Sequence, residues 1–157
     1  MKFIPESIID QKAEAIGKLS DFSGLVQGLK ENQPAVLAFL FSESFDLLTQ
    51  SEKDYALFLT LVIWESVMEF YPEVEEIDPL SIEKAEEENW EKISGVSAKE
   101  FREKLDVFFE NSPQEDLLAF LEDALVHDED DMVTKEGREY VFIAIKTIID
   151  CFDQAMK

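Results

Sequence analysis

Two similar segments lie in the two halves of this sequence, and they limit its architecture more than its composition does. Residues 37–40 and residues 118–121 both read Leu-Ala-Phe-Leu, and each is preceded by Glu-Asn-x-Pro, at 31–34 and 110–113. Further matches keep the same order along the chain, and the separation between partners grows from 74 to 85 positions. Because self-similarity at a fixed period is typical of repeated structural units, we expect a duplication whose connections lengthened in the second copy.

The duplicated units are expected at about residues 4–72 and 78–156, within one domain of residues 1–157. In every long segment the apolar residues recur at helical spacing, and none alternates with the period of two that marks a strand. Capping-box patterns open two of the segments, Thr49 with Glu52 and Ser97 with Glu100. The sequence therefore predicts an all-α fold of about eight helices, at about 5–16, 20–31, 34 onward, 50–71, 78–93, 97 onward, 113 onward and 135–155.

The last helix of each predicted unit indicates how the helices pack. Residues 55–64 and 140–145 are apolar around most of the helix circumference. A helix that is hydrophobic all round is buried on all sides. We expect these two helices to lie centrally in a compact bundle; the alternative is a short solenoid of stacked helical hairpins, as in HEAT or armadillo repeats.

The net charge of −22 restricts the classes of partner. Such a surface repels nucleic-acid phosphates and anionic lipid headgroups, so we expect neither direct nucleic-acid binding nor membrane binding. A basic protein or peptide is the electrostatically favoured partner. With a single cysteine and an apolar stretch too short to span a bilayer, the chain is expected to be soluble and cytoplasmic.

An acidic row on the helix predicted at 78–93 is the first candidate binding site. Glu83, Glu87 and Glu91 are spaced at i, i+4 and i+8, which puts them on one helix face. They form either a solvated face or a docking surface for a basic segment. Trp90 either faces the core or, if it is exposed, is an interface anchor beside these carboxylates.

The acidic loop before the last helix is the second candidate. It contains Asp128, Asp130 and Asp131, and it accounts for the extra length of this connection in the second unit. An EF-hand is excluded because position six of such a loop would be Val133 instead of glycine. The loop is either a solvated segment or a site for a cation or a basic partner.

Glu65 and Asp150 are weak candidates for a metal site, because they occupy equivalent places in the two apolar helices, 85 positions apart. Two carboxylates inside a core would need pairing or a cation; otherwise they lie at the solvated helix ends. His127 and Cys151 are the only histidine and cysteine, so a histidine- and cysteine-based zinc site cannot be built. Cys151 is expected to be an inert buried thiol.

These patterns favour a non-enzymatic interaction module (an adaptor, chaperone or inhibitor) that binds a basic or amphipathic partner. The sequence contains no glycine-rich phosphate loop and no nucleophile elbow, and no cofactor is expected. The alternative is a helical bundle that binds a metal through carboxylates, or a metal-dependent enzyme.

Overall fold

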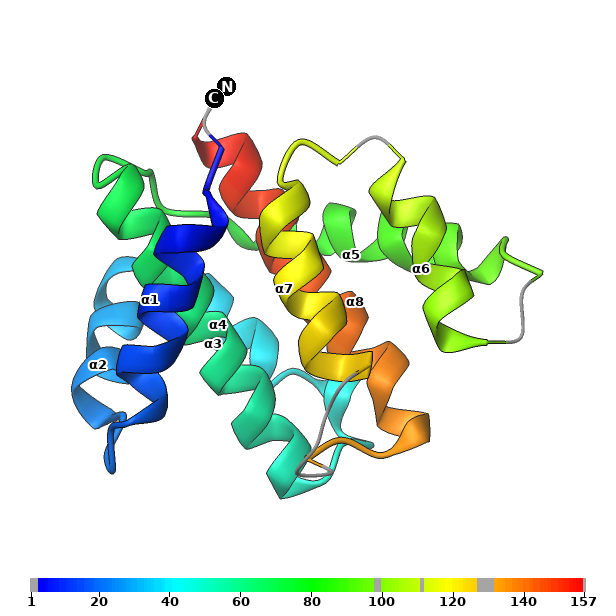
Figure 1. Ribbon diagram of the computed structural model, residues 1–157, viewed down its shortest axis with the longest axis horizontal. Coiled ribbons are helices and arrows are strands. Elements are labelled where there is room, and N and C mark those ends of the chain that lie inside the picture. Colours follow the sequence, from blue (N-terminus) through cyan, green and yellow to red (C-terminus); the bar gives the residue numbers. More distant parts are fainter. Residues whose placement is uncertain (1–2, 98–99, 111, 127–131, 157) are drawn as a thin grey trace.

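The computed structural model describes residues 3–97, 100–110, 112–126 and 132–156, and within these ranges the regular structure is entirely helical (Figure 1). This confirms the predicted all-α fold and the expected number of helices. The helices are α1 (Glu6–Gly17), α2 (Ser23–Asn32), α3 (Pro34–Leu40), α4 (Gln50–Phe70), α5 (Pro79–Ser94), α6 (Phe101–Phe109), α7 (Glu115–Val126) and α8 (Lys135–Ala155), with a short 3-10 turn, η1 (Glu43–Phe45), between α3 and α4.

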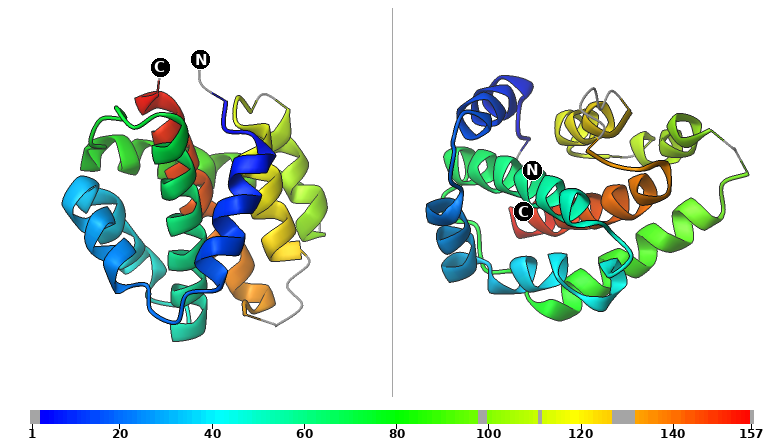
Figure 2. Two further views of the ribbon diagram at one scale, coloured as in Figure 1. Left: turned by 60° about the vertical axis from the view of Figure 1, so that its left-hand side comes forward. Right: turned by 90° about the horizontal axis from the view of Figure 1, so that it is seen from below.

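Three layers of helices make up the molecule. The long helices α4 and α8 pack against each other in the middle layer. Helices α1 and α7 cover one side of this pair, and α3 and α5 cover the opposite side (Figure 2, right). The packing is thus the compact one of the two expected geometries, because the two halves enclose a shared core instead of stacking in one direction.

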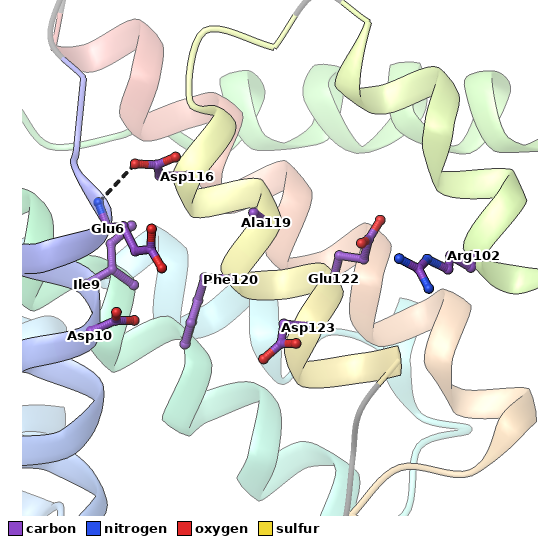
Figure 3. Close-up of a pocket in the computed structure, with 9 residues that line it drawn as sticks. All are labelled: Glu6, Ile9, Asp10, Arg102, Asp116, Ala119, Phe120, Glu122 and Asp123. Carbon is purple, nitrogen blue, oxygen red and sulfur yellow. Dashed lines mark hydrogen bonds between the residues drawn. The ribbon is translucent and has the colours of Figure 1, made fainter.

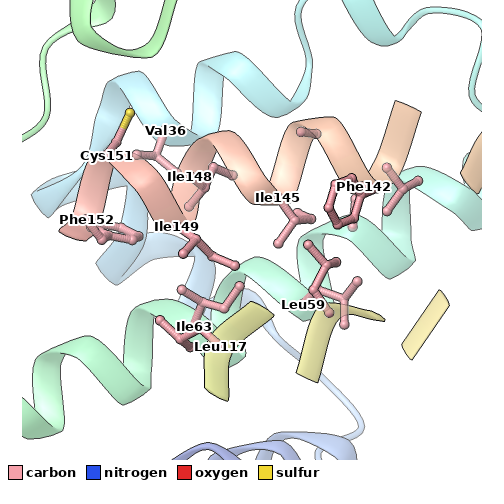
Figure 4. Packing of buried hydrophobic residues seen from close by; sticks show 14 of the residues in the cluster. Val36, Leu59, Ile63, Leu117, Phe142, Ile145, Ile148, Ile149, Cys151 and Phe152 are labelled. Atoms are coloured by element: carbon pink, nitrogen blue, oxygen red, sulfur yellow. The ribbon is translucent and has the colours of Figure 1, made fainter. Parts of the chain in front are cut away.

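The shared core lies along α4 and α8, as their apolar sequences predict. Leu59 and Ile63 of α4 and Phe142, Ile145 and Ile149 of α8 are each no more than 1% exposed (Figure 4). Trp64, at the end of the apolar stretch 55–64, is 4% exposed, and its ring stacks on Phe152 with centroids 5.4 Å apart. Among the described residues, no helix is long and apolar enough to cross a membrane.

The contacts of the first helix of each predicted unit match when the two units are exchanged. Helix α1 packs on α4 of its own unit and on α7 of the other, while α5 packs on α8 of its own unit and on α3 of the other. Each first helix therefore lies against the third helix of the opposite unit. A duplicated chain with pseudo-two-fold packing predicts this arrangement, although the duplication itself stays a prediction.

Two buried glutamines fasten the halves together in matching ways. Gln33 precedes α3, and its side-chain oxygen accepts a hydrogen bond from the N–H of Ile77, just before α5 (2.8 Å). Gln114 precedes α7, and its side-chain oxygen accepts from the N–H of Ile4, just before α1 (3.1 Å). Both glutamines are 1% exposed. Each one fixes the start of the first helix of the opposite half.

Two sequence-based assignments near helix starts are wrong. Helix α6 begins at Phe101, after Glu100 and without a side-chain cap, so Ser97 does not cap it; the first buried residue of its apolar stripe marks the start. Pro34 is the first residue of α3, whereas Pro113 lies two positions before α7. The two prolines are therefore not structurally equivalent. Gln33 and Gln114, 81 positions apart like the Leu-Ala-Phe-Leu segments, occupy the corresponding places.

Candidate functional site

The predicted acidic row lies on the outer face of α5. Glu83, Glu87 and Glu91 are all exposed, while Ile82 and Asn89 on the opposite face are buried. Leu80, which is 75% exposed, falls on the same outer face at helical spacing. The row is thus accessible to a partner along its whole length.

Trp90 sits at the margin of this surface, half-buried, and not fully in the core. Its ring meets the edge of Tyr140 of α8 with centroids 5.3 Å apart and planes at 66°. The indole N–H donates to Oε2 of Glu86 at 3.3 Å. An aromatic ring therefore stands next to a carboxylate and is held in place from two helices.

An apolar groove lies between α3 and α5, beside the acidic row. Its volume is about 300 Å³. The floor comes from small and apolar residues of both helices, and the carboxylates of Glu83 and Glu86 stand on the α5 side. The lining residues are Ala35, Ala38, Phe39, Ser42, Ser44, Pro79, Ile82, Glu83 and Glu86. Sequence reasoning missed this groove because its two walls belong to segments about 40 positions apart.

A second cavity, between α1 and α7, is larger and more acidic (Figure 3). Its volume is about 420 Å³, and Arg102 of α6 points into it toward Glu122 (Figure 3). Oδ2 of Asp116 accepts a hydrogen bond from the backbone N–H of Glu6 at 2.9 Å, which joins the two walls. The lining residues are Glu6, Ile9, Asp10, Arg102, Asp116, Ala119, Phe120, Glu122 and Asp123.

These two hollows occupy corresponding places in the predicted units. The four α3-side lining positions 35, 38, 39 and 42 match the α7-side positions 116, 119, 120 and 123, each 81 residues later. The middle two positions are Ala-Phe in both hollows. The outer two are alanine and serine in the α3/α5 groove but aspartates in the α1/α7 cavity. The groove is therefore the apolar member of the pair.

The two weak metal candidates, Asp150 of α8 and Glu65 of α4, lie in different surroundings. Asp150 is paired with Nζ of Lys146, which is itself 6% exposed, and accepts a hydrogen bond from Nδ2 of Asn89 at 3.0 Å. Glu65 is half-buried. In the part of the chain that the structure describes, no three carboxylate, cysteine or histidine side chains are grouped to hold a metal. A lysine one turn away supplies the cation that Asp150 requires.

Cys151 and the acidic loop are the remaining residues that the sequence analysis considered. Burial, with a smaller contribution from the negative charges of Asp150 and Asp78, raises the pKa of the Cys151 thiol to about 12. The side chain is 4% exposed. Such a thiol stays protonated and unreactive at neutral pH. Residues 127–131, which include Asp128, Asp130 and Asp131, lie outside the described residues.

Comparisons of this chain with protein-family models, curated proteins and solved structures found no match.

Proposed function

We propose that this protein is a non-enzymatic interaction module, an adaptor, chaperone or inhibitor, that binds a basic or amphipathic partner through α5. The observation that supports the proposal is the exposed row of Glu83, Glu87 and Glu91 next to the half-buried ring of Trp90. Carboxylates accept charge-assisted hydrogen bonds from lysine and arginine. Half-buried aromatic rings are frequent anchors at interfaces and attract cations to their faces.

The charge of the whole molecule supports the same class of partner. A net charge of −22 attracts a basic segment over a distance of about one Debye length and raises the rate of encounter. The same field repels nucleic acids and anionic membranes, so these are not proposed as direct partners. Asp150 is neutralised by Lys146, and the described residues include no group of side chains that would favour the carboxylate-metal alternative.

A labelled synthetic peptide tests the proposal directly. The probe is an amphipathic helix of about 18 residues, or five turns, with leucines along one face and lysines on the other. We expect saturable binding by fluorescence anisotropy that weakens as salt is added. The triple variant Glu83→Gln, Glu87→Gln, Glu91→Gln should lower the affinity roughly tenfold, because three charge pairs are lost.

The matched control removes an equal charge from another helix. Glu103 and Asp106 are exposed on α6, and Glu110 is exposed directly after its last residue. The variant Glu103→Gln, Asp106→Asn, Glu110→Gln therefore has the same net charge as the α5 variant. We expect it to bind the peptide with nearly wild-type affinity. Equal losses in the two variants would show that total charge, and not a site on α5, attracts the peptide; absence of binding to the wild type would reject the proposal.

A further inference from the structure

We propose that the groove between α3 and α5 receives the apolar face of a basic amphipathic helix, with the acidic row of α5 contacting the basic residues of that helix. This inference rests on the proposed function and assigns a place and an orientation to the partner. Amphipathic helices commonly bind by laying residues at i, i+3, i+4 and i+7 into a hydrophobic groove.

Two small side chains of α3 and one firmly packed aromatic ring line the groove on the α3 side. Ala38 is exposed and Ala35 is half-buried, so α3 leaves open space where larger residues would fill it. Phe39 is 8% exposed and packs edge-on against Phe45, with centroids 5.1 Å apart. Because this ring is held by η1, the groove is formed before a partner arrives, which lowers the entropy lost on binding.

Exposed apolar residues are next in sequence to residues that line the groove. Leu80, 75% exposed, follows the lining residue Pro79, and Phe41, 55% exposed, precedes the lining residue Ser42. Leu47, 79% exposed, lies just beyond η1. Large side chains left in water around an apolar hollow are typical of interaction surfaces.

The charge around the groove determines which partner fits it. None of the groove-lining residues is basic, and two of them, Glu83 and Glu86, are acidic. Glu43 and Asp46, on the segment that contributes Ser44, are exposed and acidic as well. An apolar stripe flanked by lysine or arginine therefore matches both the floor and the rim.

The groove and Trp90 form one continuous surface. Glu86 lines the groove and accepts the hydrogen bond from Trp90, whose ring contacts Tyr140. Tyr140 in turn lines a further hollow of about 340 Å³ together with Leu47. From Pro79 to Trp90, α5 extends over about 17 Å, so the surface accommodates roughly three turns of a partner helix.

The test uses two peptides and two matched variants of the full chain. The amphipathic peptide is compared with a scrambled peptide of identical composition that has no apolar face. Ala38→Trp fills the groove, and Ala119→Trp places the same change at the corresponding exposed position of the α1/α7 cavity. We expect wild type to prefer the amphipathic peptide. Ala38→Trp should lower this affinity at least tenfold, and Ala119→Trp should leave it within twofold.

A second variant keeps the test decisive if Ala38→Trp folds poorly. Leu80→Ser changes an exposed side chain outside the core and should weaken the amphipathic peptide severalfold without affecting the scrambled one. Equal binding of the two peptides, or a loss caused by Ala119→Trp and not by Ala38→Trp, overturns the groove assignment. In that case the proposed function still stands if the α5 triple variant binds more weakly than the α6 control.

Two further results would overturn the inference for different reasons. A wild-type dimer that Ala38→Trp dissociates would make a second copy of the chain the occupant of the groove. Failure of both peptides to bind the wild-type chain would reject the proposed function together with the groove assignment. The measurements therefore distinguish an error in the groove assignment from an error in the proposed class of partner.

Discussion

Glu52 joins the starts of the two long helices through one carboxylate. It is 2% exposed and closes the predicted capping box with Thr49, whose N–H donates to its Oε1 at 2.8 Å. Its Oε2 accepts from both the N–H and the hydroxyl of Thr134, which caps α8, at 2.8 Å each. The capping box was visible in the sequence, but the reach to Thr134, 82 positions away, was not.

Gly137 provides the space that the Glu52 carboxylate occupies. A Cβ added to Gly137 would lie 1.9 Å from Oε2 of Glu52, whereas one added to Gly28 in α2 would meet nothing within 4 Å. We expect Gly137→Ala to lower the free energy of unfolding by about 1–3 kcal/mol, as overpacking does. Gly28→Ala should raise it by about 0.5–1 kcal/mol through helix propensity. Denaturant unfolding of the two variants checks this, and equal effects would contradict the steric argument.

The charge state of Glu52 should make stability depend on pH. Burial favours the neutral acid, but the hydrogen bonds from Thr49 and Thr134 outweigh it and hold the pKa of Glu52 below its ordinary value of 4.5. A carboxyl with a lowered folded-state pKa stabilises the fold above its unfolded-state pKa, and this contribution is lost as pH falls through the folded-state pKa. Wild type should therefore lose the Glu52 contribution in acid below about pH 4.5.

Glu52→Gln isolates this contribution from the other carboxylates. The variant should be less stable at pH 7 by about 1–3 kcal/mol, because an amide cannot accept all the bonds that the carboxylate accepts. We expect the gap between variant and wild type to shrink as pH falls from 6 to 3. Unfolding midpoints measured at several pH values test this, and a gap independent of pH would show that Glu52 acts only by packing.

At the scale of elements, the buried glutamines determine which helices lie side by side. Gln33 accepts from the N–H of Ile77 and donates to the carbonyl of Glu75 at 3.0 Å, and so it ties the loop before α5 to the start of α3. These two helices form the walls of the proposed groove. The position of α5, and with it the acidic row, depends on this tie.

Removing the Gln33 side chain should therefore lower the free energy of unfolding. Gln33→Ala leaves two backbone groups without their hydrogen-bond partner, at about 1–3 kcal/mol for each that stays buried. Gln27→Ala removes an amide that bonds Glu31 on the exposed surface of α2, and it should change stability by about 0.5 kcal/mol or less. Thermal and denaturant unfolding compare the two. A similar small effect in both variants would mean that water replaces the lost contacts of Gln33.

On the scale of the whole molecule, the contacts between the halves predict that neither half folds alone. Helix α1 depends on α7, α5 on α3, and α4 on α8. A chain divided between Pro72 and Glu73 should give fragments without cooperative unfolding, because each exposes the inner face of its long helix. Mixed fragments should regain helicity and a cooperative transition by circular dichroism. Cooperative unfolding of either fragment by itself would contradict this dependence.

Much of the fold could be read from the sequence. Helix positions, the burial of α4 and α8 and the exposure of Glu83, Glu87 and Glu91 follow from residues a few positions apart. The start of α6 was misplaced, because burial of Phe101 and not the cap at Ser97 defines it. Of the proposed surface, the acidic row could be predicted from the sequence. The groove could not, because the residues of α3 and α5 do not indicate that these two helices pack against each other.

The sequence by itself determined the helices, their apolar faces and the acidic character of the surface, because periodicity and capping act over a few residues. Only the tertiary structure decided that α3 faces α5, that Lys146 neutralises Asp150, and that Gly137 makes room for Glu52. The ties formed by Gln33, Glu52 and Gln114 join residues 42 to 110 positions apart. Such contacts depend on the packing of the whole chain, and no local pattern specifies them.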